Sequence, residues 1–389
     1  MTERWNKDGH NVTVLTGQPA YNDIYKIKQA RRETIGGVNV IRVPLLPEIK
    51  KLNILRSINF MFFSIQCILH ALFNRYDLVV INSYPPILMG LTALLIKKIK
   101  KVPYIYHIQD IHPESSYIAG MIKNLFAYRL LQKIDLMNCR YASQVITLSE
   151  DMANTLVQRG LLRTKILVMN NFILDTNSVK REIPAQLLCK RDDEFSLLFA
   201  GNIGNFQGLD SIIEAAWMFK DNRKIKFIFM GEGSAKAGLI KQTGALLNNT
   251  VFFIPFQPLE TAFSFMEKSD FAIISLRQDV YRVAYPSKTM MYLAAGCPVV
   301  AIIEEESILA HEIESKGLGY AVSQNNAARL SETISRAWDE REIWKGKRAH
   351  IKNTATELFG RDRILGNWSK IVEGIHQQSA VSQKAIETY

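Results

Sequence analysis

Residues 195–216, "FSLLFAGNIGNFQGLDSIIEAA", decide the fold because an apolar run, a glycine-rich turn and an amphipathic run follow one another directly. The apolar run predicts a buried strand that ends at Gly201, and the segment from Leu209 onward predicts a helix. Gly201, Gly204 and Gly208 would let the backbone approach a ligand closely, beside the partial positive charge of a helix amino end. An ordinary tight turn explains the same glycines equally well.

The alternation of strand and helix extends through the whole chain. In the second half we predict strands at 195–201, 225–231, 250–255, 270–276, 297–303 and 319–323, and helices at 209–219, 235–247, 260–268, 288–295, 307–316 and 327–338. In the first half we predict strands at 11–16, 38–44, 77–83, 103–108, 144–149 and 165–171, and helices at 52–73, 86–99, 116–140 and 150–159. Apolar strands that alternate with helices indicate parallel sheets covered on both faces.

The expected architecture is α/β, with two doubly wound Rossmann-like domains that face a cleft at the carboxyl ends of their strands. A polar stretch at 174–194 is the expected linker between a domain at 1–173 and a domain at 195–360. The helical segment 361–389 is expected to cross back to the first domain. The chain opens on a helical segment that leads into what would be a second strand. The central first strand is therefore expected to be missing, unless the true start lies upstream of Met1.

Composition and charge limit the kinds of molecule that the protein is expected to bind. The 389 residues carry a formal charge of +11, and residues 1–175 hold 22 Lys and Arg against 12 Asp and Glu. This basic first half suits an anionic partner, such as phospholipid head groups, a pyrophosphate-bearing substrate or nucleic acid, although an ordinary solvated basic surface explains it equally well. Four scattered cysteines indicate neither a zinc site nor a disulfide framework. The apolar stretch 58–73 is shorter than the roughly 20 residues that span a bilayer. It predicts either a core helix or a helix against an anionic membrane surface.

Two more turns in the second half have the geometry of an anion site. "FMGEGSA" (229–235) repeats the glycine pattern with Gly231 and Gly233 around Glu232. "YPSKTMMYLAAGCPVVA" (285–301) opens a helix with Pro286 and a possible cap, Ser287, followed by Lys288. A lysine in a first helical turn is unfavourable for the helix, so an anionic ligand is its natural compensation, whereas a tolerated surface lysine is the plainer reading. Arg277 and Arg282 lie nearby and strengthen the phosphate interpretation.

A cluster of polar residues lies at the end of one predicted strand in the first half of the chain. "YHIQDIHPESS" (106–116) places His107, Asp110, His112 and Glu114 within a few residues, at a strand's carboxyl end. Acid–base chemistry or hydroxyl binding suits these groups. Their spacing fits no familiar zinc pattern, and simple capping of the following helix is a serious competitor.

Taken together and in order, "AGNIGNFQGLDSIIEAA", "FMGEGSA", "YPSKTMMYLAAGCPVVA" and "QDIHPES" resemble the family-four glycosyltransferases of the GT-B fold, in the O-antigen and capsule branch related to fucosamine transferases. The resemblance implies transfer of a sugar from a nucleotide-sugar, expected to be UDP-linked, to a lipid-pyrophosphate-linked glycan at the cytoplasmic membrane face. It implies no metal and no cofactor, since protein donors neutralise the departing diphosphate. Retention of configuration is implied by the wider family.

The site residues follow from the motifs and the resemblance together. Asp110 and Glu114 are the catalytic candidates. The donor-binding candidates are Gly201, Asn202, Gly204, Gln207, Gly231, Glu232, Gly233, Arg282, Tyr285, Pro286, Ser287, Lys288 and Met291. The wider family has Arg and Lys where this chain has Asn202 and Gln207, and glutamates where it has Val283 and Met291.

The expected partners are the nucleotide-sugar, the lipid-linked saccharide and an anionic membrane surface, without nucleic acid. The expected location is cytoplasmic and peripheral at the inner membrane face. Two alternatives stay open: a non-catalytic paralogue that binds nucleotide-sugar or scaffolds partners, and a nucleotide-sugar epimerase of the same fold. An oxidoreductase is disfavoured because no GxGxxG follows the first strand.

Overall fold

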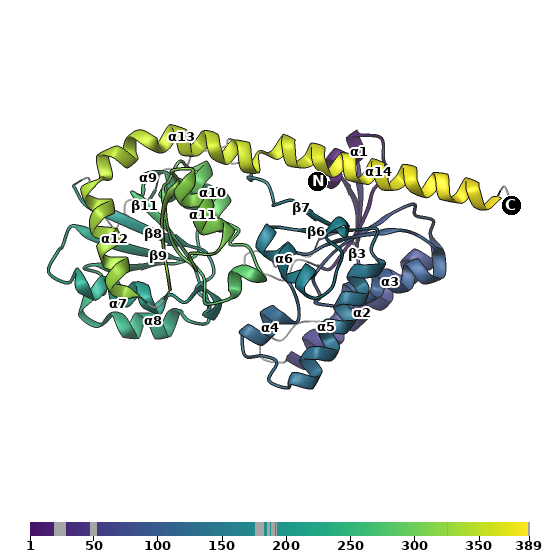
Figure 1. Ribbon diagram of the computed structural model, residues 1–389, viewed down its shortest axis with the longest axis horizontal. Coiled ribbons are helices and arrows are strands. Elements are labelled where there is room, and N and C mark those ends of the chain that lie inside the picture. Colours follow the sequence, from purple (N-terminus) through teal and green to yellow (C-terminus); the bar gives the residue numbers. More distant parts are fainter. Residues whose placement is uncertain are drawn as a thin grey trace.

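The computed structural model describes residues 1–18, 29–46, 53–175, 193–324 and 326–387, together with residues 183, 184, 187 and 191. It shows two α/β domains side by side, with the last two helices of the chain running in succession along the same edge of both (Figure 1). The predicted fold class is confirmed, because each domain is built on parallel strands flanked by helices. Most of the predicted linker, 174–194, lies outside the described residues.

The second domain is a six-stranded parallel sheet with the order β10-β9-β8-β11-β12-β13. Its strands are β8 (Phe195–Ala200), β9 (Ile225–Met230), β10 (Val251–Ile254), β11 (Phe271–Ser275), β12 (Val299–Ile302) and β13 (Gly319–Val322). Its helices are α7 (Asp210–Met218), α8 (Lys236–Thr243), α9 (Leu259–Lys268), α10 (Lys288–Ala294), α11 (Ile308–Ser315) and α12 (Ala327–Asp339). β8 and β11 are neighbours in the sheet, so the topological switch point, where ligands of doubly wound folds bind, lies between them.

The first domain contains two separate sheets instead of the single sheet that the alternation predicts. β4 (Val79–Asn82), β5 (Tyr104–His107), β6 (Gln144–Thr147) and β7 (Ile166–Val168) are all parallel. β1 (Thr13–Thr16) pairs in parallel with β3 (Val38–Arg42), and β3 pairs antiparallel with β2 (Arg32–Ile35). Gly36 and Gly37 join β2 to β3 at φ of 56° and 83°, a backbone that glycine adopts without strain.

The helices of the first domain are α1 (Thr2–Lys7), α2 (Asn53–Phe73), α3 (Leu88–Lys100), α4 (Glu114–Ile118), α5 (Leu125–Tyr141) and α6 (Glu150–Gln158). The single helix predicted at 116–140 is wrong. The chain leaves α4 at Gly120, where φ is 71°, and α5 begins after Asn124, whose side chain caps it.

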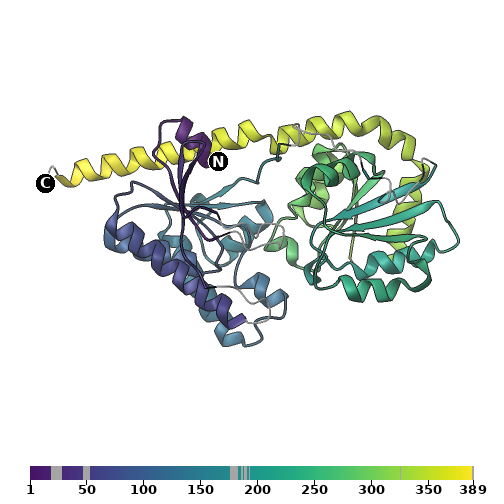
Figure 2. The same cartoon turned by 180° about the vertical axis from the view of Figure 1, so that it is seen from behind.

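The end of the chain returns to the first domain. α13 (Arg341–Phe359) covers the second domain, and α14 (Arg361–Glu387) runs along the first (Figures 1 and 2). Trp368 of α14 is 2% exposed and contacts the rings of Trp5 and His107 edge-on, with centroids 5.8 and 5.0 Å apart. Ser369 donates a hydrogen bond of 2.5 Å to Asp8. α14 therefore supplies part of the first domain's core.

Candidate functional site

A pocket of about 270 Å³ lies between the two domains, at the carboxyl ends of β5 and β11. Six of the predicted site residues line it: Asp110, Gln207, Tyr285, Pro286, Ser287 and Lys288. Sequence reasoning assigned no role to other lining residues, among them Ser115, Phe206 and Ser275. Ser275 ends a strand and Phe206 precedes Gln207, so their positions at strand ends and in the first glycine turn were the available signal.

Lys288 is the cation of this pocket. It opens α10 and lays its ammonium over the ring of the buried Phe199, 3.7 Å from the centroid. In the described part of the chain no acidic side chain pairs with it. Burial of the amine lowers the pKa of Lys288 to about 7. The predicted cap is not present, because the side chain of Ser287 makes no capping hydrogen bond to the helix.

The two glycine turns interlock beside Lys288. A Cβ at Gly201 would come within 2.3 Å of the Lys288 side chain, and one at Gly231 within 2.0 Å of the Gly201 carbonyl oxygen. A Cβ at Gly233 would meet the carbonyl of Ile203 at 2.1 Å. Close backbone approach therefore requires glycine at 231 and 233 and brings the ends of β8 and β9 together, whereas Gly201 leaves room for the Lys288 side chain.

The Gly204 turn is held by its neighbours' amide groups. Gln207 accepts a hydrogen bond of 3.1 Å from the Gly204 backbone N–H. A Cβ at Gly204 would lie 2.7 Å from the side chain of Asn202, which is itself exposed. Asn202 and Gln207 thus shape the turn at the positions where the wider family carries cations.

Asp110 lies where the two domains touch. It forms an isolated antiparallel bridge with Ala284, and the Ile111 N–H donates to the carbonyl of Val283 at 2.7 Å. The pocket walls withdraw water from the Asp110 carboxyl and raise its pKa, although the residue remains exposed at the rim. Val283, which stands where the wider family has a glutamate, is 2% exposed and packs into the core of the first domain.

Glu114, the second catalytic candidate, is engaged elsewhere. Its carboxylate accepts hydrogen bonds from Arg159, with 2.6 Å between Nε and Oε1, and from Gln132 at 2.6 Å. Arg159 also contacts Asp135 at 2.7 Å and the carbonyl of His112 at 2.8 Å. Glu114 does not line the pocket and is 9% exposed, so the structure places it in a buried ionic cluster behind the pocket.

Three further donor candidates lie outside the pocket lining. Arg282 is exposed and pairs with Asp279 at 3.2 Å, while its carbonyl accepts from Thr155 of the first domain. Glu232 pairs with Lys236 at 2.8 Å. Met291 packs against the core of the second domain.

His112 lines the pocket beside Asp110, and burial together with Arg159 lowers its pKa to about 4, which keeps the imidazole neutral. Its ring lies 2.9 Å from the hydroxyl of Ser115. Within the residues that the structure describes, no three His, Cys, Asp or Glu side chains gather as a metal would need.

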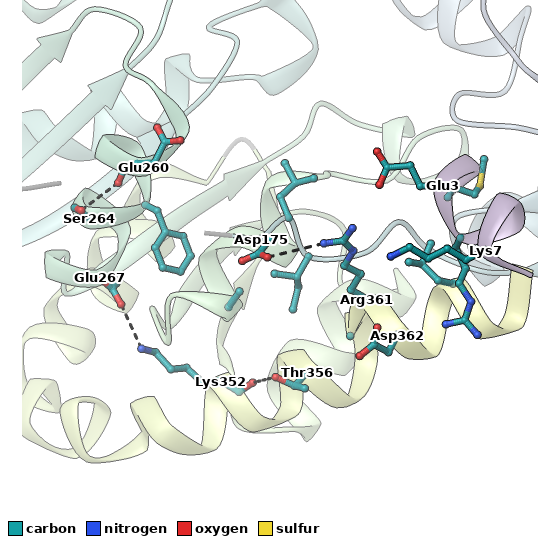
Figure 3. Close-up of a pocket in the computed structure, with 18 residues that line it drawn as sticks. Glu3, Lys7, Asp175, Glu260, Ser264, Glu267, Lys352, Thr356, Arg361 and Asp362 are labelled. Carbon is teal, nitrogen blue, oxygen red and sulfur yellow. Dashed lines mark hydrogen bonds and ion pairs between the residues drawn. The ribbon is translucent and has the colours of Figure 1, made fainter. Parts of the chain in front are cut away.

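A larger cavity of about 880 Å³ opens between α1, α9 and the junction of α13 with α14 (Figure 3). Two ion pairs join charged side chains of its lining: Lys352 pairs with Glu267 at 3.4 Å and Arg361 with Asp175 at 3.9 Å. It is a groove at the domain junction and holds none of the predicted site residues.

Both domains match families of known proteins. Residues 1–171 match the glycosyl transferase 4-like domain, and residues 180–358 match the glycosyl transferases group 1 family. WbjE of Pseudomonas aeruginosa, named a glycosyltransferase, is 24% identical over 66% of this chain, which spans 65% of its length. WcaI of Escherichia coli, named a colanic acid biosynthesis glycosyl transferase, is 23% identical over 87% of the chain and 86% of its own length.

Solved structures show the same architecture. Sucrose-phosphate synthase of Thermosynechococcus elongatus superposes with a TM-score of 0.75 at 14% identity, over 97% of this chain and 92% of that one. HepE of Anabaena, solved in complex with UDP, superposes with a TM-score of 0.67 at 16% identity, over 87% of this chain and 86% of that one. At these identities the likeness shows the fold alone. The sequence matches and the two-domain fold agree with the resemblance drawn from the motifs, and the chain belongs to the family-four glycosyltransferases of the GT-B fold.

Proposed function

We propose that this protein transfers a sugar from a nucleotide-sugar, with UDP as the nucleotide, to a lipid-linked glycan during assembly of a surface polysaccharide. Lys288 is the observation that carries the proposal, because its ammonium is held against the Gly201 turn and has no acidic partner in the described part of the chain. Covering a cation in this way is costly unless an anion joins it. A diphosphate is such an anion, and HepE, of the same fold, is a UDP-binding protein.

The donor is proposed to lie along the switch point of the second domain. Its diphosphate meets Lys288 and the backbone of the turns at Gly201, Gly204 and Gly231, which lie at the carboxyl ends of β8 and β9. These fixed groups stabilise the charge that develops on the departing diphosphate, without a metal ion.

The acceptor is proposed to approach from the first domain, beside Asp110. That carboxylate lies on the opposite wall of the same pocket as Lys288, which suits contact with a sugar hydroxyl. We also propose that the configuration at the anomeric carbon is retained during transfer. Glu114 is assigned to the support of this wall, through Arg159.

A membrane surface is proposed to meet the flank of the first domain formed by α2 and the end of α3. By length and composition, Leu55–Phe73 is the one described helix that could cross a bilayer. However, Asn59 of α2 exchanges two hydrogen bonds of 2.9 Å with Leu46, and Cys67 and Ala71 are buried against the domain. α2 therefore lies along the protein and presents only its outer face: Met61, Phe62, Ile65, Leu69 and Phe73.

A basic cluster borders this apolar face. It consists of Lys97, Lys98, Lys100 and Lys101 at the end of α3, and Lys100 donates to the carbonyl of Leu72 in α2. Apolar side chains beside lysines favour the interface of an anionic bilayer over its interior. The lipid-linked acceptor would then reach the cleft from that surface.

Calorimetry with UDP and UDP-glucose tests the donor site. Lys288→Ala should weaken UDP binding by about 100-fold, as expected for loss of a charge-assisted contact worth 1.5–3 kcal/mol. Lys241→Ala is the matched control, since Lys241 is an exposed lysine of α8 outside the pocket. Equal UDP affinity in the Lys288→Ala and wild-type proteins would show that the diphosphate does not bind at this site.

A further inference from the structure

One segment of the second domain packs into the core of the first. Residues 280–285, which we call the bridging segment, lie between β11 and α10. Val280 and Tyr281 are buried in the hydrophobic cluster of the second domain, whereas Val283 is 2% exposed and belongs to the cluster of the first. Tyr285 packs against both clusters. The apolar side chains of this short segment are therefore shared between the two cores.

The backbone of the bridging segment is also bonded to the first domain. The Ile111 N–H, in the loop after β5, donates to the carbonyl of Val283 at 2.7 Å. The Thr155 hydroxyl, in α6, donates to the carbonyl of Arg282 at 2.7 Å. Because Val283 is buried, leaving its carbonyl unpaired is unfavourable. Two elements of the first domain therefore hold successive carbonyl groups of the second.

A separate contact joins α6 to α11. The Ile308 N–H, in the first turn of α11, donates to Oδ2 of Asp151 at 3.0 Å. Ser307 caps the same helix end, where its hydroxyl accepts from the Ala310 N–H at 3.1 Å. A carboxylate is stabilising at the amino end of a helix. α6 therefore holds the second domain at two places, the bridging segment and the start of α11.

The bridging segment forms part of the pocket wall between Asp110 and Lys288. Val283 and Ala284 line the pocket, and Ala284 pairs with Asp110 in the isolated antiparallel bridge. Only residues 286 and 287 separate the segment from Lys288. Movement of the segment relative to the first domain therefore changes the separation of the Asp110 carboxyl from the Lys288 ammonium.

These contacts differ from those of an ordinary interface between domains of one chain. Such interfaces are usually polar and permit relative motion of the domains. Here, separation of the domains would bring a buried valine into water and break the hydrogen bonds that Ile111 and Thr155 donate. The arrangement favours one fixed position of the two pocket walls.

We propose that the bridging segment is a latch that holds the two domains together in the ligand-free protein. Val283 and Thr155 are positioning residues of this latch. They act through Asp110 and Lys288, by fixing the pocket walls that carry these two side chains. The latch is independent of the proposed function, whereas its effect on sugar transfer rests on it.

Hydrogen exchange of single amides in the ligand-free protein tests the latch. The Ile111 amide reports on it, because its acceptor is the Val283 carbonyl. The Ile108 amide, which donates to Ile146 within the first domain's sheet, is the reference. Val283→Ser should speed exchange at Ile111 by about 30-fold, since a buried apolar side chain is lost, and leave Ile108 unchanged.

Val157→Ser is the control for this variant, because Val157 lies on the exposed side of α6. It should leave the exchange rates at Ile111 and Ile108 unchanged. Equal exchange at Ile111 in the wild type and in Val283→Ser would overturn the proposal. Equal acceleration at Ile111 and Ile108 would also overturn it, since the whole first domain would then be less stable.

A second variant removes only a hydrogen bond. Thr155→Val should speed exchange at Ile111 by about fivefold, as expected for the loss of one hydrogen bond, whereas Thr155→Ser should retain the wild-type rate. Thr333→Val in α12 is the matched control, because both threonine hydroxyls also contact the carbonyl four residues earlier in their own helix. Acceleration in Thr155→Ser or in Thr333→Val would contradict the role of Thr155.

Kinetics separate positioning from donor binding. UDP is proposed to contact the second domain, so Val283→Ser should change UDP affinity by less than about twofold, while glucose release from radiolabelled UDP-glucose slows by about tenfold. A parallel loss of UDP affinity would place Val283 in the donor site and overturn its role as a positioning residue. If the wild type neither binds UDP nor releases glucose, the proposed function fails. The exchange measurement needs no ligand and then decides the latch by itself.

Discussion

Lys288 shows how the burial and pKa of one residue depend on elements that are distant from it in the sequence. The sequence placed a full charge at the start of a helix, and its proximity to the glycine turns followed from the order of strands and helices. Its lowered pKa could not be predicted from that order, because the amine is buried by contacts with Phe199 in β8 and with the Gly201 turn. These contacts exist only once the sheet has formed.

UDP affinity should therefore depend on pH. The pKa of Lys288 in the free protein is about 7, and a bound diphosphate stabilises the ammonium and raises this pKa. Binding then takes up a proton above pH 7, and the affinity should fall by roughly tenfold per pH unit between pH 7.5 and 9. Calorimetry at pH 8 in two buffers of different ionisation enthalpy measures the proton uptake.

Lys288→Arg is the control for this pH dependence. A guanidinium stays charged over the whole range, so its UDP affinity should be nearly constant from pH 7 to 9. An equally steep decline in the arginine variant would assign the titration to another group.

Substitutions of Asp110 and Glu114 should have different effects, one on activity and the other on stability. Asp110→Asn should reduce sugar transfer by about 100-fold with little change in Tm, since this carboxyl lies at the exposed rim of the pocket. Glu114→Gln should reduce the free energy of unfolding by about 3 kcal/mol, because it breaks a buried ion pair with Arg159. Denaturant unfolding and a radiolabelled transfer assay measure the two effects. A stable but inactive Glu114→Gln protein would restore Glu114 as a catalytic candidate.

At the scale of elements, the spacing of apolar residues predicted the positions of strands and helices well. It predicted the connections between them poorly. The six strands of the second domain were all predicted, since each is a buried apolar run between turn residues. The strand at Arg32–Ile35 was missed because three of its four residues are polar and three are exposed, although Gly36 and Gly37 signalled a hairpin. The break at Gly120 was missed because the residues on both sides favour helix.

The pocket itself could be anticipated only in part. Asp110, Gln207 and Lys288 end or follow strands, so the doubly wound rule brought them to one edge. Glu114 sits four residues from Asp110 and looked equivalent in sequence. Its partner Arg159 is 45 positions away, and no local pattern reports that pairing.

The outer face of α2 should carry membrane binding. The double change Phe62→Ser and Ile65→Ser removes exposed apolar side chains and leaves the buried side of the helix intact. Binding to vesicles containing phosphatidylserine should fall by about 30-fold or more, since each of the two lost side chains contributes roughly 1–2 kcal/mol at a bilayer interface. Vesicle sedimentation measures the bound fraction.

Met218→Ser, on the exposed face of α7 in the second domain, is the matched control. It should bind vesicles like the wild type. If both proteins lose binding equally, general surface hydrophobicity and not the α2 face is responsible. Raising the salt concentration should weaken binding further, through the lysines at the end of α3.

At the scale of the whole molecule, α14 follows the second domain in the chain and packs into the core of the first. Trp368→Ala should cost about 3–5 kcal/mol of unfolding free energy, since the ring is buried between Trp5 and His107. The first domain should then unfold at lower denaturant than the second, which intrinsic fluorescence and hydrogen exchange can resolve. Trp217→Ala is the control, because Trp217 is 40% exposed on the second domain. A uniform loss of stability in both domains would contradict the assignment of Trp368 to the first.

The return of α14 also sets the timing of synthesis. The strands of the first domain leave the ribosome early, while the helix that covers Trp5 and Met169 is made only after the whole second domain. At 5–20 residues per second, the roughly 200 residues in between take about 10–40 s to translate. Throughout that interval the nascent first domain exposes the apolar surface that α14 will cover, which makes it a natural client for chaperones that act on chains still attached to the ribosome.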